Sequence, residues 1–70
     1  MENMGIRIKS RRIALGYSVD ELAALLDKNR STLFRYESGE ILNMHLSALV
    51  KLSQALGVSL DYLVLGKEAE

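Results

Sequence analysis

The segment over residues 29–39 contains the side chains that are best suited to specific binding chemistry. Six of its polar or aromatic residues share or flank one sector of a helical wheel about 100° wide, at about 100° per residue: Arg30, Ser31, Thr32, Phe34, Arg35 and Ser38. Arginine carries a fork of donors that matches the O6 and N7 acceptors of guanine, and phenylalanine can pack on a thymine methyl group. Leu33 and Tyr36 point to the opposite side of this helix, with Glu37 beside them.

Other kinds of site chemistry have no candidates in the sequence. The chain has no cysteine, and His45 is its one histidine. Neither a disulfide framework nor a thiolate metal site can form without cysteine, and no pair of carboxylates has a spacing typical of catalysis. We therefore expect no enzyme activity, no metal and no cofactor. His45 is expected to lie on the surface near the start of a helix.

Length and composition indicate one small helical domain. The chain has 70 residues, no proline and 49% hydrophobic residues, which is typical of a compact helical protein rather than a disordered one. No apolar run is long enough to span a membrane, and the N-terminus does not resemble a signal peptide. We expect a cytoplasmic protein in which residues 1–70 form one domain, with a core over about 4–66 and a short polar tail at 67–70.

The formal net charge of zero hides a difference between the two halves of the chain. Residues 1–35 contain seven Lys and Arg against four Asp and Glu, a net charge of +3. Residues 36–70 contain two against five, a net charge of −3. This distribution suggests that one face contacts a polyanion, although two ordinary solvated surfaces would give the same counts.

The first two helices follow from an apolar stripe and a capping signal. A stripe that ends at Gly16 predicts a helix over about residues 3–15, with the apolar positions Met4, Ile8 and Leu15. Ser18 can accept a hydrogen bond from the amide of Glu21, while the carboxylate of Glu21 reaches back to the amide of Ser18. This capping box marks the start of the second helix, whose apolar positions are Leu22, Ala23, Leu25 and Leu26.

Three further helices complete the chain. Asn29 is a good N-cap for a helix that ends at Gly39. A loop over about residues 40–44 leads to a fourth helix over 46–57, and Ser59 can cap a fifth. The apolar surface of the fourth helix consists of Leu46, Leu49, Val50, Leu52 and Leu56. Because every local signal predicts a helix, we expect an all-α fold of five short helices.

The second and third helices have the dimensions of a helix-turn-helix. Each has about two turns, and the polar residues 27–29 join them. In that motif the first helix crosses the DNA backbone and the second enters the major groove. An ordinary helical hairpin in a small bundle would give the same pattern, so the motif alone does not decide the function.

A longer pattern resembles a known family. The resemblance is to the lambda-repressor-like, Cro-type (XRE family) helix-turn-helix domain, and it rests on RIKSRRIALGYSVDELAALL, RSTLFRYESG and LVKLSQALGVSLDYL. Its most specific points are Arg12, SxxELA at 18–23, RYESG at 35–39 and ALGVSLDYL at 55–63. The resemblance covers about residues 4–66. It implies a compact five-helix fold and a bacterial or phage transcription regulator that binds a palindromic operator in double-stranded DNA, often as a homodimer.

The resemblance also implies roles for individual residues. Five residues match base-contacting positions of the family: Arg30, Ser31, Thr32, Phe34 and Arg35. Four are candidates for phosphate contacts, which position a protein without specifying sequence: Lys9, Lys28, Asn29 and Ser38. Lys9, Arg11 and Lys28 are weaker candidates for phosphate contacts, because solvation alone explains these charges equally well. Phe34 could instead pack against a loop. Arg12 and Glu37 match a partly buried ion pair, which would outweigh the unfavourable position of a carboxylate near the C-terminus of a helix.

The sequence departs from the family pattern at several positions. Val19 stands where the family often has a DNA-contacting glutamine, and Asp27 replaces a turn glycine, a change that aspartate tolerates because it can adopt the left-handed conformation. Glu40 would repel phosphate. The apolar loop residues that follow it leave open a second function, a protein-interaction module that binds a toxin, as an antitoxin does, or a partner regulator through residues 41–44 and the fifth helix. In this loop the apolar residues are Ile41, Leu42 and Met44.

The fifth helix is expected to pair two copies of the chain. Val64 and Leu65 are apolar residues that this helix cannot all turn inward. The resemblance favours a dimer interface in this region, away from the basic half of the chain. A patch this small must overcome the entropic cost of association, so pairing is expected on DNA even where it is weak in solution.

Overall fold

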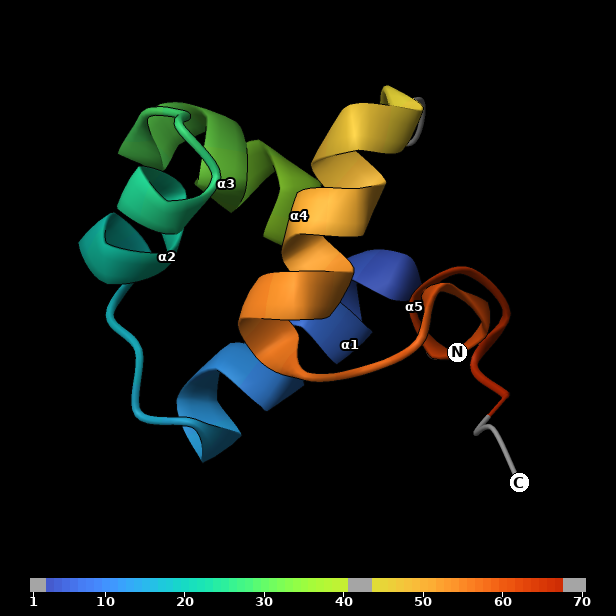
Figure 1. Ribbon diagram of the computed structural model, residues 1–70. Coiled ribbons are helices and arrows are strands. Elements are labelled where there is room, and N and C mark those ends of the chain that lie inside the picture. Colours follow the sequence, from blue (N-terminus) through green and yellow to red (C-terminus); the bar gives the residue numbers. More distant parts are fainter. Residues whose placement is uncertain (1–2, 41–43, 68–70) are drawn as a thin grey trace.

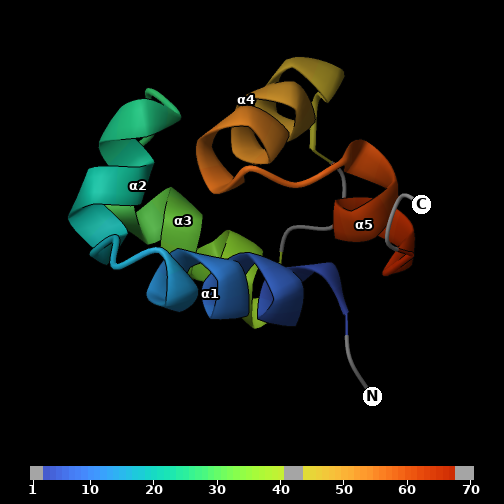
Figure 2. The same cartoon turned by 60° about the horizontal axis from the view of Figure 1, so that its bottom comes forward.

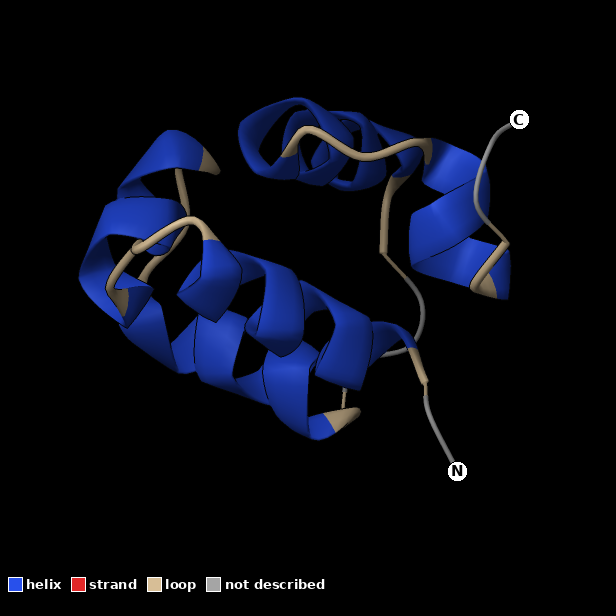
Figure 3. Cartoon of the chain, turned by 90° about the horizontal axis from the view of Figure 1, so that it is seen from below, coloured by secondary structure: helices blue, strands red, loops and turns tan. Residues whose placement is uncertain are grey.

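The computed structural model describes residues 3–40 and 44–67. Five helices joined by short loops make up this part of the chain, and it contains no strand (Figures 1 and 3). They are α1 (Met4–Ala14), α2 (Val19–Leu25), α3 (Arg30–Ser38), α4 (Leu46–Leu56) and α5 (Leu60–Leu65). The predicted all-α, five-helix fold is therefore confirmed. None of these helices has the length and apolar character needed to cross a bilayer.

Asparagine and serine side chains begin four of the described helices. The N-cap side chains that accept a hydrogen bond from an amide of the first turn are Asn3, Ser18, Asn29 and Ser59. At Ser18 the capping box is complete: the Glu21 amide donates to Oγ over 3.0 Å, and the Ser18 amide donates to the Glu21 carboxylate over 2.8 Å. The bond from the Ser18 amide is the main reason that the pKa of Glu21 lies below its ordinary value.

Two left-handed residues delimit α3. Asp27 has φ of 56° in the turn between α2 and α3, and Gly39 has φ of 82° after the last turn of α3. Glycine has no steric penalty in this region, and aspartate has a small one. The turn of the helix-turn-helix is therefore preserved without a glycine at position 27.

The five helices meet in one hydrophobic core. Helix α1 lies beside α3, and α4 and α5 pack together across from this pair (Figure 2). Seven large side chains are fully buried, and they come from every helix or its end: Ile8, Leu22, Leu26, Leu33, Leu52, Leu56 and Leu63. Complete burial of such a side chain contributes about 1.5–3 kcal/mol. Because all five helices contribute to this core, it fixes their mutual arrangement.

Three leucines that the helical patterns assigned to the core are exposed instead. They are Leu15, Leu25 and Leu46. Leu15 follows the last residue of α1, and Leu25 lies about 100° from the centre of the buried face of α2, at about 100° per residue. Leu46 is the first residue of α4, beyond the edge of the core, and Ala48 takes the buried position.

Helices α1 and α3 approach closely at Gly5. A Cβ atom at this position would lie 2.5 Å from the backbone oxygen of Glu37 and 2.6 Å from that of Tyr36. Real Cβ atoms essentially never lie under 3.0 Å from another heavy atom. Only glycine therefore permits this separation of the two helices, and the sequence patterns did not identify it.

Candidate nucleic-acid interface

One side of α3 faces solvent and the other faces the core. Leu33, Tyr36 and Glu37 are buried. The side chains on the opposite face are exposed, with Thr32 half-buried at its margin: Arg30, Ser31, Phe34, Arg35 and Ser38. The structure therefore places all five base-contact candidates together on or beside one accessible helical surface.

A buried ion pair holds this helix against α1. Arg12 Nε donates to Glu37 Oε2 over 2.7 Å, and Arg12 Nη2 donates to Glu37 Oε1 over 3.3 Å. Only 11% of the Arg12 side chain and 5% of the Glu37 side chain are exposed. Arg12 Nη1 also donates to the carbonyl of Tyr17, in the loop before α2. The expected pair is thus bidentate, and Arg12 links α1 to α3 and to the loop that leads into α2.

The two arginines on the outer face of α3 each have an acidic neighbour. Arg30 Nε lies 3.3 Å from Asp20 Oδ1, and Arg35 Nε lies 3.5 Å from Glu40 Oε2. More than half of each of these side chains is exposed. Exposed ion pairs contribute only about 0.2–1 kcal/mol, so either guanidinium can leave its carboxylate for another acceptor.

Phe34 lies between charged side chains on the same surface. The guanidinium carbon of Arg30 is 5.7 Å from the centre of the Phe34 ring, within the range of a cation–π contact. Half of Phe34 is exposed. Together with Lys9 and Ser38, its ring borders a hollow of about 200 Å³ between α1 and α3. The ring therefore packs only partly, and it remains available to a ligand.

The four phosphate-contact candidates fall into two groups at opposite ends of α3. Lys9 and Ser38 border the same hollow near the C-terminal end of the helix. Lys28 and Asn29 precede its first turn and are exposed. The Asn29 side-chain oxygen accepts a hydrogen bond from the Thr32 amide over 2.8 Å, which leaves the Asn29 amide group as the donor for a phosphate.

Two arginines of α1 have structural roles that sequence reasoning missed. Arg7 is buried, and it donates to the carbonyls of Leu63 and Val64 over 3.0 and 3.1 Å. Arg11 donates to the carbonyl of Leu56 over 2.8 Å. These carbonyls lie at the C-terminal ends of α5 and α4, where a cation is favourable. Arg11 is therefore engaged within the fold, contrary to its interpretation as a solvated side chain or a weak phosphate contact.

The apolar surfaces proposed for partner binding are only partly present in the described structure. Val64 and Leu65 are exposed on α5, with 47% and 62% of their surface accessible. Met44 is half-buried and packs against the core, so it does not belong to an exposed loop patch. Ile41 and Leu42 lie outside the described residues.

Comparisons with known proteins identify the fold with a defined family. A helix-turn-helix family model matches residues 8–63. A curated relative, the SPbeta prophage-derived uncharacterized HTH-type transcriptional regulator YonR of Bacillus subtilis (strain 168), is 39% identical over 66 residues. This match covers 94% of the chain and 60% of the relative, so the chain spans less than two thirds of that protein.

Two solved structures of DNA complexes have the same fold. The P22 c2 repressor, in complex with synthetic operator 9T, matches with a TM-score of 0.89 and 30% identity over 96% of this chain and all of that one. SinR, named as the master regulator for biofilm formation and solved in complex with DNA, matches with a TM-score of 0.79 and 37% identity. That match covers 86% of this chain and 95% of SinR's solved chain. With its exposed α3 face and its buried Arg12–Glu37 pair, the chain belongs to the lambda-repressor-like, XRE-type family of helix-turn-helix domains.

Proposed function

We propose that this protein is a transcriptional regulator that binds double-stranded DNA by placing α3 in the major groove. The observation that supports this most is the accessible face of α3, which carries Arg30 and Arg35 on a helix that the Arg12–Glu37 pair joins to α1. The related P22 c2 repressor and SinR were both solved in complex with DNA, and YonR is named a transcriptional regulator. Residues 4–66 form the DNA-binding unit in this proposal.

Base recognition rests on the outer face of α3. Arg30 and Arg35 each exchange an exposed carboxylate for the O6 and N7 acceptors of a guanine. The half-exposed Phe34 ring packs on a thymine methyl group. Ser31 and Thr32 supply short hydroxyl groups that bind either a base edge or the backbone.

Phosphate contacts at the two ends of α3 set its depth and direction in the groove. Lys9 and Ser38 serve one strand, and Lys28 and Asn29 serve the other. Such contacts fix the position of a protein on the duplex and carry no sequence information of their own. The proposal therefore separates residues that specify bases from residues that orient the helix.

The proposal extends to assembly, location and the absence of catalysis. Two copies bind a palindromic operator as a homodimer in the cytoplasm, where the chromosome of a bacterial host lies. The protein acts by binding and not by catalysis, as is typical of the regulator family to which it belongs. Exposed Val64 and Leu65 on α5 form the pairing surface in this proposal.

Replacement of Arg35 by alanine tests the major-groove proposal. A preferred duplex is first selected from a random pool with the wild-type protein. Arg35→Ala should then bind it about 1–3 kcal/mol more weakly and should lose preference at one base position. Lys67→Ala, a matched loss of charge beyond α5, should leave both quantities unchanged. If Arg35→Ala keeps both its affinity and its preference, α3 does not read the bases in this way.

A further inference from the structure

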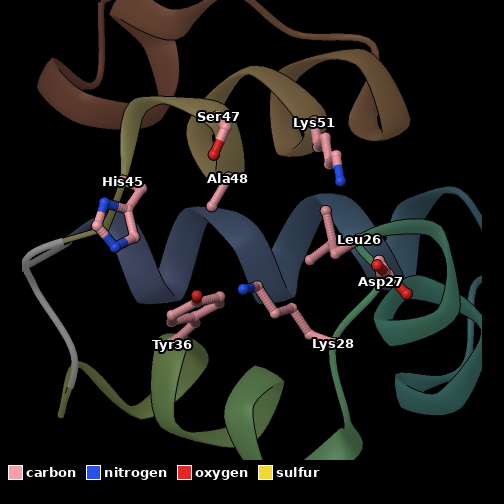
Figure 4. Close-up of a pocket in the computed structure, with 8 residues that line it drawn as sticks. All are labelled: Leu26, Asp27, Lys28, Tyr36, His45, Ser47, Ala48 and Lys51. Atoms are coloured by element: carbon pink, nitrogen blue, oxygen red, sulfur yellow. The ribbon is translucent and has the colours of Figure 1, made fainter.

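Phe34 is the aromatic side chain that α3 presents to solvent. The other aromatic residue of this helix, Tyr36, is only 6% exposed and points from α3 toward Ala48 of α4 (Figure 4). Phe34 lies on the opposite side of the helix, and half of it is exposed. Burial in the core therefore does not account for a phenylalanine at position 34. The ring lies instead where α3 can meet a ligand.

The Phe34 ring is in contact with the guanidinium group of Arg30. The two residues are four positions apart, so their side chains lie on the same side of α3. The guanidinium carbon lies 5.7 Å from the ring centre. Within residues 3–40 and 44–67, this is the only cation–π contact. Arg35, the other arginine of this surface, makes no such contact, so the two arginines differ in what surrounds them.

This contact restricts the position of the Arg30 guanidinium when it leaves Asp20. The ion pair with Asp20 is exposed, with 3.3 Å between Nε and Oδ1, and such a pair is easily exchanged. The face of an aromatic ring attracts a cation without using its N–H groups. The N–H donors of arginine point outward in the plane of the guanidinium, where a base can accept from them. Phe34 is therefore suited to position Arg30 while its donors remain free.

Two side chains in contact reach neighbouring bases. Successive bases of one strand are about 3.4 Å apart along the duplex axis, so the 5.7 Å between the guanidinium and the ring centre is more than one such step and less than two. In the major groove, guanine offers O6 and N7 to an arginine, and thymine offers its C5-methyl group to an apolar side chain. With Arg30 on a guanine, the Phe34 ring therefore reaches the edge of the adjacent base pair.

We propose that Arg30 and Phe34 recognise two adjacent base pairs as one unit: a guanine, and a neighbouring pyrimidine that carries a C5-methyl group. This proposal rests on the function proposed above, and it specifies the chemistry of the DNA that α3 prefers. A 5-methylcytosine carries the same C5-methyl group as thymine, whereas cytosine and deoxyuridine lack it. DNA binding by this protein therefore responds to methylation of cytosine at this position.

Duplexes that differ by one methyl group test the wild-type protein. A preferred duplex is selected from a random pool, and each thymine is replaced in turn by deoxyuridine to find the methyl group that is contacted. At that position, thymine should bind about fourfold more tightly than deoxyuridine, and 5-methylcytosine about fourfold more tightly than cytosine, because the contact buries one methyl group. The proposal is overturned if no thymine responds, if 5-methylcytosine and cytosine bind equally, or if no guanine lies in an adjacent base pair.

Two variants of Phe34 separate the methyl contact from the positioning of Arg30. Phe34→Ala removes both, so it should bind the methylated and unmethylated duplexes equally. Phe34→Leu keeps an apolar side chain without an aromatic face, so it should retain the methyl preference and lose about two- to fivefold of the preference for guanine. Ile13→Ala, at an exposed apolar position of α1, should change neither preference. A methyl preference that survives in Phe34→Ala, or a guanine preference unchanged in both Phe34 variants, overturns the unit.

Arg35→Ala distinguishes failure of this unit from failure of the proposed function. Suppose that the wild type selects a duplex and that Arg35→Ala loses preference at one base, but that methyl groups have no effect. The proposed function then stands, and the Arg30–Phe34 unit alone is overturned. A wild type that selects no duplex overturns both. Thermal melting verifies that each variant is folded, and the methyl substitutions in DNA test the wild type without any variant.

Discussion

The Arg12–Glu37 pair shows how one contact can set both stability and the orientation of α3. Both side chains are almost fully buried, and two hydrogen bonds join them. Glu37→Ala leaves a buried guanidinium whose one remaining partner among the described residues is the Tyr17 carbonyl. Loss of one partner of a fully buried pair costs about 3–5 kcal/mol. Unfolding in urea should reveal a loss of stability of this size.

The matching double variant separates the charge from the packing. Arg12→Met with Glu37→Leu removes both charges and retains apolar volume, so it should be more stable than Glu37→Ala. Both variants lack the ion pair, but only Glu37→Ala retains a buried arginine without its carboxylate. A loss below about 1 kcal/mol in Glu37→Ala would be typical of an exposed pair, and it would contradict the burial seen here.

The acidic neighbours of Arg30 and Arg35 should restrain DNA binding. Asp20 and Glu40 hold these arginines in the free protein and place negative charge beside a polyanion. Asp20→Asn and Glu40→Gln should each strengthen duplex binding, because the released pair contributes about 0.2–1 kcal/mol. Fluorescence anisotropy at fixed salt measures the change. Asp61→Asn on α5 is the control for net charge, and an effect equal to that of Glu40→Gln would refute a local mechanism.

At the scale of elements, a close approach between α1 and α3 depends on Gly5. Alanine in a helix interior is more favourable than glycine by about 0.8–1 kcal/mol. Gly5 lies in the first turn of α1, so helix propensity alone predicts that Gly5→Ala is stabilising by no more than this amount. The backbone oxygens of Tyr36 and Glu37 leave no room for the Cβ atom, and overpacking costs about 1–3 kcal/mol. Because backbone cannot move aside as a flexible side chain can, we expect a net loss of stability in thermal melting.

A matched substitution on the same helix makes this test specific. Ser10 is exposed on α1, so Ser10→Ala should change stability by no more than about 0.5 kcal/mol. If Gly5→Ala melts above the wild type, α1 and α3 are farther apart than the structure places them.

Local signals predicted most of the elements, and distant contacts account for what they missed. Ser18 and Asn29 mark helix starts, and Gly39 marks a helix end. Each does so through hydrogen bonds to residues only a few positions away in the sequence. Gly5 and Arg7 act on partners more than 30 residues away along the chain, and no local pattern contains those partners. Leu46 was misassigned for a related reason, because a periodic pattern does not show where the core ends.

At the scale of the whole molecule, much of the positive charge is used within the fold. Three arginines of α1 donate to Glu37 or to the ends of α4 and α5: Arg7, Arg11 and Arg12. The excess of positive charge in the first half of the chain therefore overstates what a polyanion can contact. One copy of the domain offers few phosphate contacts, and its DNA affinity should fall with salt less steeply than that of a protein with 6–10 such contacts.

Two copies on adjacent grooves would compensate for these few contacts. Recognition helices that read successive major grooves lie about 34 Å apart, and the molecule is 32 Å along its longest axis and 23 Å along the others. Neighbouring copies in direct contact can therefore span this distance without a linker. Helix α5 is suited to the contact because Arg7 secures its C-terminal end while Val64 and Leu65 remain exposed.

Leu65→Lys tests the pairing surface. The substitution places a charge in the proposed apolar contact between two copies. Because the side chain at position 65 is exposed in the monomer, the monomer should stay folded with an unchanged melting temperature. On a duplex with two half-sites, cooperativity should disappear, whereas binding to a single half-site should keep the wild-type affinity. Sedimentation compares self-association of the two proteins in solution. If two copies met at this small apolar patch, the lysine would have to lose its hydration, which is unfavourable. Cooperative binding of Leu65→Lys as tight as that of the wild type would therefore place the dimer interface elsewhere.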